Sequence, residues 1–163
     1  MLKNRLLETI VIVLGVVSLV IGAAFIGIAV QKNNYLVGQL RAQKITLGLT
    51  KDQIAKGGLV DNSQEAQLAA ETLAKHLTSI AATYNDLMAA NPSGKYDPSN
   101  SKDLTYTAGL NMENSFNLIV LGFGVVQQTA VTGATLAVIG IAITLAGVIL
   151  FRRKRVPSTT SNT

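Results

Sequence analysis

The sequence predicts an all-α membrane protein in which two antiparallel transmembrane helices extend into a small extracytoplasmic helical bundle. The chain of 163 residues is 48% apolar and only 14% charged. Its charges are missing from two long stretches, one between Glu8 and Lys32 and one between Glu113 and Arg152. About 18 consecutive apolar residues are enough to cross a bilayer as a helix. No stretch shows a convincing alternating pattern of a β-strand.

The first apolar stretch predicts a cytoplasmic N-terminus at residues 1–8 and a first transmembrane helix at residues 9–31. A cleaved signal peptide is the alternative for residues 1–30, because the segment starts with basic residues and has small residues near Gly27 and Ala29. The apolar core of a signal peptide is about 7–15 residues long. The longer core found here favours an uncleaved anchor.

The second apolar stretch predicts another transmembrane helix at residues 132–151. The stretch from Asn117 to Phe151 would be about 52 Å long as a helix, which is more than one span needs. It is too short for two spans and a turn. Residues 117–131 are therefore expected to project beyond the bilayer and to need a protein cover.

Small residues recur along both predicted spans at steps of three, four or seven. In lipid, helices associate through close backbone contact, which small residues permit. We therefore expect a helix-packing face made by Gly15, Ser18, Gly22, Ala29, Gly133, Ala137, Gly140, Thr144 and Gly147. The alternative is that glycine is simply commoner in membrane helices than in soluble ones. The spacing does not decide whether the faces meet within one chain or between copies.

The net charge of +5 comes from the two ends of the chain. Residues 31–131 hold eight Lys or Arg and eight Asp or Glu, whereas the termini carry Lys3, Arg5, Arg152, Arg153, Lys154 and Arg155. Cations beside spans stay cytoplasmic. These topology anchors predict two cytoplasmic termini, including a basic, disordered tail at residues 152–163, and an extracytoplasmic domain at residues 32–131. This distribution indicates a lipid bilayer as partner and argues against nucleic acid.

The central region predicts helices. Residues 33–45 are expected to continue the first helix, and Thr50 with Gln53 predicts a capping box that opens a short helical turn. The main helix is expected at about residues 63–90, because an apolar stripe runs through Ala66, Ala70, Leu73, Leu77, Ile80, Tyr84 and Leu87. Two prolines and a glycine then predict a loop at residues 91–102, and the long helix is expected from about residue 103.

The sequence offers no constellation for catalysis, a cofactor or a metal. His76 is the single histidine, and Thr72 and Ile80 stand where helical metal partners would be needed. The carboxylates are scattered, and no ionisable residue lies inside either predicted span, which argues against a transporter. We predict no enzyme activity, no cofactor and no metal. The absence of cysteine and of glycosylation acceptors in the outer region fits the cytoplasmic membrane of a bacterium.

The segment "LRAQKITLGLT", followed by "EAQLAAETLAKHL", resembles a loose group of small uncharacterised bacterial two-span membrane proteins with a helical extracytoplasmic domain. The resemblance is carried by Arg41, Ala42, Lys44 and Ile45 after the first span. It covers about the first half of the chain and the general plan. The group has no agreed activity, so the resemblance implies none here.

These observations predict a non-enzymatic accessory, scaffold or assembly component of a larger membrane complex, with a protein partner or further copies of itself. The alternative is an extracytoplasmic small-ligand-binding or sensory module that acts through a partner, with a pocket ringed by Tyr35, Tyr84, Tyr106 and Phe116. An enzyme is the third hypothesis. It would require scattered carboxylates to converge with His76 in a cleft.

Overall fold

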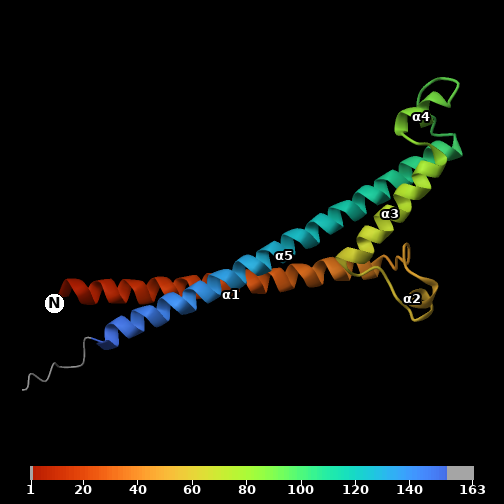
Figure 1. Ribbon diagram of the computed structural model, residues 1–163. Coiled ribbons are helices and arrows are strands. Elements are labelled where there is room, and N and C mark those ends of the chain that lie inside the picture. The colour runs from red at the N-terminus through yellow and green to blue at the C-terminus, as the bar shows by residue number, and fades with distance from the viewer. Residues whose placement is uncertain (1, 154–163) are drawn as a thin grey trace, which may run out of the picture. The chain divides into compact units, whose positions relative to one another are not determined.

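The computed structural model describes residues 2–153, with side chains from Leu6 to Arg152, and these residues form an all-α structure. They divide into two compact units: unit 1 is residues 2–32 with residues 126–153, and unit 2 is Asn33–Val125. The elements (Figure 1) are α1 (Leu2–Ala42), α2 (Lys51–Ala55), α3 (Ser63–Ile80), α4 (Tyr84–Ala89) and α5 (Ser101–Arg153). The predicted all-α class is confirmed.

Unit 1 consists of α1 and α5 packed antiparallel against each other. In the part of α1 that belongs to unit 1, the buried residues recur at every seventh position, as Glu8, Gly15, Gly22 and Ala29. In α5 the same spacing gives Gly133, Gly140 and Gly147. A seven-residue repeat keeps one face of each helix turned toward the other along a gentle left-handed supercoil. The packing of the two apolar helices against each other is as the sequence predicts.

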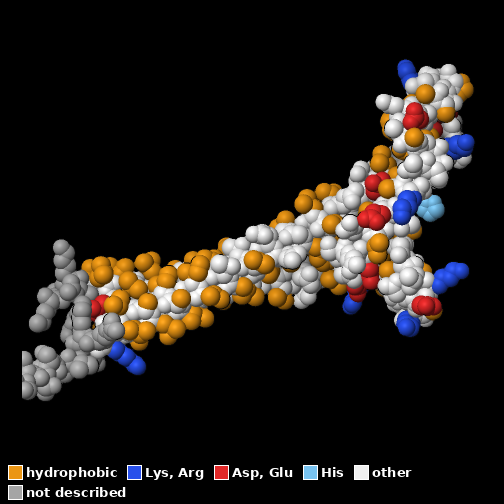
Figure 2. All heavy atoms as spheres, in the orientation of Figure 1, with side chains coloured by type: hydrophobic (Ala, Val, Ile, Leu, Met, Phe, Trp, Pro, Cys, Tyr) orange, Lys and Arg blue, Asp and Glu red, His pale blue; other side chains and the backbone are white. Residues whose placement is uncertain are grey.

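The outward faces of this helix pair are apolar. Two helical segments of the described chain, Leu6–Ala42 and Ser101–Arg152, are long and apolar enough to cross a membrane, and only 11% of the most apolar window of each is buried. The core helix of a soluble protein would be mostly buried. Figure 2 shows hydrophobic side chains covering the visible face of the pair. Those at least 55% exposed are Leu6, Leu7, Leu14, Val20, Val30, Val138, Leu145 and Ile149.

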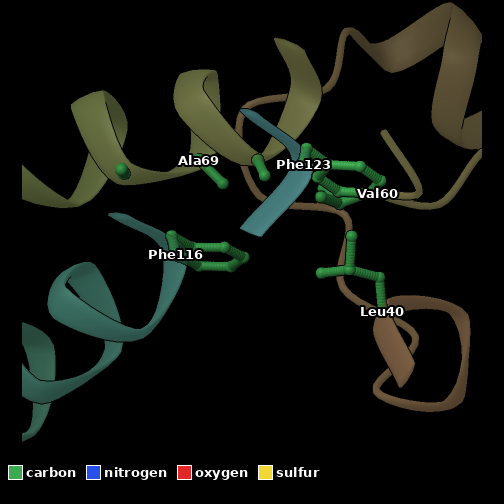
Figure 3. Close-up of a cluster of buried hydrophobic side chains, with 7 residues drawn as sticks. Leu40, Val60, Ala69, Phe116 and Phe123 are labelled. Carbon is green, nitrogen blue, oxygen red and sulfur yellow. The ribbon is translucent and has the colours of Figure 1, made fainter. Parts of the chain in front are cut away.

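The main core of unit 2 joins α3 to α1 and α5. Its buried side chains (Figure 3) are Leu40, Val60, Ala66, Ala69, Ala70, Phe116 and Phe123. Three alanines on one face of α3 allow its backbone to approach the two phenylalanine rings of α5 closely. The first helix continues beyond residue 32 as predicted, but it ends at Ala42 rather than at residue 45. Leu36 and Leu47 pack against this core as partly buried side chains.

The segment that joins α1 to α3 is fixed by local capping and by a close backbone approach. Thr50 and Gln53 form the predicted capping box at the start of α2. Gly48 has a φ of 82°, and a Cβ atom there would lie 2.9 Å from the carbonyl carbon of Leu68. Only glycine fits this position, because the loop lies directly against the backbone of α3 in a left-handed conformation.

The prediction of one helix over residues 63–90 is wrong. α3 ends at Ile80, and α4 begins at Tyr84 after an extended Ala81 and the N-cap Thr83. The Thr83 hydroxyl accepts a hydrogen bond from the backbone N–H of Asp86 and donates one to the Asp86 carboxylate. This cap competes with continued helix. The break also brings Leu87 into a second core cluster with Leu77 and Tyr106.

The long helix starts slightly earlier than predicted, at Ser101 rather than about residue 103, so the loop is shorter than residues 91–102. The side chain of Asn100 accepts a hydrogen bond from the backbone N–H of Lys102. A side chain of this kind satisfies one of the free N–H groups at a helix start and so fixes the boundary.

Candidate functional site

Four glycines of unit 1, Gly15, Gly22, Gly133 and Gly140, lie so close to the backbone of the partner helix that a larger residue would not fit. A Cβ atom on Gly22 would lie 2.6 Å from both the backbone nitrogen of Ala137 and the carbonyl oxygen of Gly133. One on Gly140 would lie 2.6 Å from the backbone nitrogen of Leu19. The two backbones therefore touch, and they do so within one chain.

The structure brings six of the nine residues expected at the packing face into contact with one another. Gly15 contacts Gly140 and Thr144, Gly22 contacts Gly133 and Ala137, and Gly147 lies against Ile12. The Thr144 hydroxyl donates a hydrogen bond to the Gly140 carbonyl oxygen at 2.7 Å, so its polar group is satisfied within α5. Of the other two residues, Ala29 is buried and Ser18 is half-buried.

The cations predicted as topology anchors lie mostly beyond the described side chains. Arg152 is exposed at the end of α5. The side chains of Lys3, Arg5 and Arg153, together with residues Lys154 and Arg155, fall outside the description. The anchoring role of this group therefore stays a prediction.

Glu8 is the residue of unit 1 that the sequence reasoning missed. It is 5% exposed, although it was counted only as a charge at the edge of the first span. Its burial is indicated by its position in the seven-residue repeat, seven residues before Gly15. Its burial puts a carboxylate on the packing face of α1.

Unit 2 contains a groove between the end of α1 and the N-terminal half of α5, with a volume of about 430 Å³. The apolar side chains that line it are Leu40, Ile45, Met112, Phe116 and Ile119. Its polar side chains are Gln39, Gln43, Asn111 and Ser115. Among the residues that the structure describes, every side chain lining this groove is uncharged. Leu40 and Phe116 are almost fully buried and belong to the main core, so the groove has a rigid floor.

The aromatic pocket expected from the sequence does not form. Tyr84 and Tyr106 lie near each other, with ring centroids 6.4 Å apart, but Tyr106 is buried in the second core cluster and Tyr84 is 45% exposed. Phe116 lines the groove, whereas Tyr35 is 61% exposed. Four aromatic residues taken from different helices could not be placed by periodicity alone, because their grouping depends on how the helices pack.

A buried polar cluster holds the loop between α4 and α5. One carboxylate oxygen of Asp103, which is 1% exposed, accepts hydrogen bonds from the Asn91 side-chain amide at 2.6 Å and from the backbone N–H of Asp97 at 2.8 Å. Asn91 also donates to the Lys95 carbonyl oxygen and accepts from the Asn100 side chain. The second oxygen of Asp103 is buried without a hydrogen-bond partner within the structure. The cluster links Asn91, Lys95, Asp97 and Asn100 of this loop to the start of α5.

His76 is exposed on α3. Within the side chains described, from Leu6 to Arg152, no three His, Cys, Asp or Glu residues gather into a metal-binding group. Hydrogen bonds donated by the Ser99 hydroxyl and backbone N–H to Asp97 lower the pKa of that carboxyl below its usual value, as expected for a turn-capping carboxylate.

The "RAQKI" segment has a structural part in unit 2. The Arg41 guanidinium pairs with the Asp61 carboxylate at 2.6 Å, and the Val60 N–H donates to the Ile45 carbonyl oxygen at 2.8 Å. Lys44 adopts a φ of 51°, which turns the chain between these two contacts. The segment fastens the end of α1 to the start of α3.

Comparisons of the chain with protein-family models, with curated proteins and with solved structures gave no match. The resemblance carried by Arg41, Ala42, Lys44 and Ile45 stays a prediction. The function proposed below depends only on the residues and their geometry.

Proposed function

We propose that this chain is a non-enzymatic integral membrane protein that crosses the bilayer twice, as α1 and α5, and serves as an accessory or scaffold component of a membrane complex. The supporting observation is the arrangement of unit 1. Its glycine faces are in backbone contact, while large apolar side chains cover its outer surface. Soluble monomers rarely expose apolar patches larger than a few hundred Å². A lipid environment accounts for both features, because lipid covers the apolar faces and close backbone contact holds the helices together.

In this proposal both termini are cytoplasmic and unit 2 lies outside the cytoplasmic membrane of a bacterium. The cations at the two ends of the chain support this orientation. Unit 2 is then the part available to partners, because the small-residue faces of the spans are already occupied by each other. Unit 2 holds seven Lys or Arg and eight Asp or Glu, and this nearly neutral balance fits a protein contact rather than nucleic acid.

Single-cysteine labelling tests the topology directly, because the natural chain contains no cysteine. Ser93→Cys lies in the loop of unit 2 and Ser158→Cys lies in the tail. In intact cells a membrane-impermeant maleimide should label the first variant and label the second only after lysis. Labelling of both before lysis, or release of the protein by alkaline carbonate, would overturn the two-span proposal.

The scaffold part of the proposal predicts a stable assembly. Purification in a mild detergent should recover the chain with a defined partner or as a defined oligomer. Recovery of a monomer alone under all gentle conditions would contradict it.

The groove of unit 2 favours a second candidate function, that of a membrane-anchored ligand-binding module. About 300–1,000 Å³ is the usual volume of small-molecule pockets, and such pockets combine apolar walls with a few polar groups. The groove at Leu40 and Phe116 meets both conditions. A ligand that copurifies with the chain and is displaced by changes in this groove would support it.

A further inference from the structure

The groove of unit 2 has the composition of a site for a neutral amphipathic molecule. We propose that it binds an uncharged molecule with a hydrocarbon chain. Its apolar part lies over Ile45, Met112 and Ile119, above the buried floor of Leu40 and Phe116, and its polar part is held by the side chains of Gln39, Gln43, Asn111 and Ser115. This inference rests on the proposed function only in that the ligand would come from, or partition into, a bilayer crossed by α1 and α5.

The absence of charge in the lining of this described groove determines the class of ligand. Two glutamines, one asparagine and one serine offer both donors and acceptors but no full charge. A ligand with a carboxylate or ammonium group would lose hydration on entering the groove and would find no opposite charge there, which is unfavourable. Hydroxyl, ester and carbonyl groups would be matched by these side chains. The Ser115 hydroxyl donates to the Asn111 carbonyl oxygen at 2.8 Å, and its oxygen is left to accept.

The apolar part of the lining fits a flexible chain. Leu40 is 1% exposed and Phe116 is 2% exposed, so the floor is held by the main core. Met112 is 46% exposed at the edge of the groove. Methionine adapts its shape easily and is often used where the ligand surface varies.

One stripe of α5 connects the groove to the end of unit 2 that leads into the apolar spans. Steps of four and three join Asn111, Ser115, Leu118, Gly122 and Val125 on one helix face. The stripe is polar at the groove and apolar beyond it, where Leu118 is 68% exposed and Val125 is 61% exposed. α1 enters unit 2 at Asn33. Gln39 lies six residues further along, which is about 9 Å along the helix axis. A chain-bearing molecule could therefore reach the groove along an apolar surface.

Photolabelling of the full chain in detergent micelles tests the site. The probe is a monoacylglycerol that carries a diazirine in its acyl chain, and the comparison probe is the fatty acid with the same diazirine chain. We expect saturable labelling of peptides containing Met112 or Ile119 by the neutral probe, and about tenfold weaker labelling by the anionic one. Unlabelled monoacylglycerol should compete. Competition by a diacylglycerol as well would identify a bilayer lipid as the source, whereas competition by single-chain molecules alone would identify a freely diffusing lipophile.

Two matched variants separate the groove from the rest of the apolar surface. Ser115→Phe should fill the groove and weaken saturable labelling about tenfold. Asn114→Phe makes a similar change at the adjacent exposed position, which does not line the groove, and should leave labelling unchanged. Circular dichroism on both variants checks that they fold alike. A fold defect in the first would be bypassed with Gln43→Glu, which places a charge at the rim and should also weaken binding of the neutral probe.

Several results would overturn the proposal. Labelling that never saturates, that spreads equally over unit 1, or that is unaffected by Ser115→Phe would show that the groove is not a site. Equal labelling by the anionic probe would contradict the class of ligand. Oxidation of Ser115→Cys to a disulfide-linked dimer, with loss of labelling, would show that a second copy covers the groove. The topology test with Ser93→Cys is independent, so either proposal can fail alone.

Discussion

Unit 1 packs two helices through glycines in backbone contact, whereas unit 2 packs α3 against α1 and α5 through two phenylalanines, a leucine and three alanines. The same two long helices take part in both. The difference follows from the surroundings that we propose for each unit. In lipid there is no hydrophobic drive between helices, so contact area and close approach must hold them. In water the burial of large apolar side chains supplies most of the stability.

The two units should therefore fail in opposite ways. Loss of a large buried side chain should damage unit 2, and gain of a side chain at a glycine should damage unit 1. The predictions below test this contrast, from the largest expected effect to the smallest.

Phe116→Ala should destabilise unit 2 by about 3–5 kcal/mol, because Phe116 is 2% exposed and its removal leaves a cavity in the main core. Hydrogen exchange read by mass spectrometry should show faster exchange of the α3 amides, with the amides of unit 1 unchanged. Leu118→Ala is the matched control. Its side chain is 68% exposed, and the change should stay within about 0.5 kcal/mol. Equal effects of both variants would contradict the core assignment.

Gly22→Leu should destabilise the helix pair of unit 1 by about 1–3 kcal/mol or more, because its Cβ atom would lie 2.6 Å from backbone atoms that cannot move aside. Thermal unfolding in detergent should detect the loss. Gly27→Leu adds the same side chain to the same helix where nothing lies within 4 Å, so it should be tolerated. If both leucines were tolerated, the contact between the two backbones would not be what holds unit 1 together.

Much of unit 1 was predictable, because a repeat of small residues carries the packing face of a long helix directly. Gly15 and Gly22 on α1, and Gly133 and Gly140 on α5, could be read from spacing alone. The burial of Glu8 continues the same seven-residue repeat, but a charged residue is not part of the small-residue pattern that predicts the packing face. The spacing of small residues is the same whether the two faces meet within one chain or between copies. Only the fold shows that they meet within one chain.

Unit 2 was less predictable, because periodicity shows which residues would share a face but not where a helix ends. Tyr84 and Leu87 continue the four-three steps of α3, yet Thr83 caps a new helix between them and Leu77. The groove and the Asp103 cluster depend on residues far apart in the sequence. Such sites arise from packing between helices, and sequence patterns within one segment, such as periodicity and capping motifs, do not predict them.

Asp103→Ala should destabilise the loop at residues 91–100 by about 1–3 kcal/mol. The change removes the buried carboxylate that accepts hydrogen bonds from the Asn91 amide and the Asp97 N–H. Limited proteolysis should then cut this loop faster, with α3 still protected. Lys102→Ala, at the exposed neighbouring position, is the control and should leave the rate of cleavage unchanged. Faster cleavage throughout unit 2 would show that the cluster supports the whole unit rather than its loop.

The smallest effect is expected at Asp97, whose side chain caps the same loop from its exposed side. Hydrogen bonds from the Ser99 hydroxyl, then from the Ser99 N–H, lower the pKa of Asp97 from the usual 3.8. A lowered pKa in the folded state means that the ionised carboxylate stabilises the loop above pH 3.8, and that this contribution is lost as the pH falls through the lowered value. Ser99→Ala should raise the pKa of Asp97 toward 3.8 while leaving stability at pH 7 nearly unchanged, since the group is solvent-exposed. Titration of the Asp97 carboxyl carbon by NMR measures the shift, and a pKa that did not rise would contradict the assignment of the Ser99 hydroxyl as its main cause.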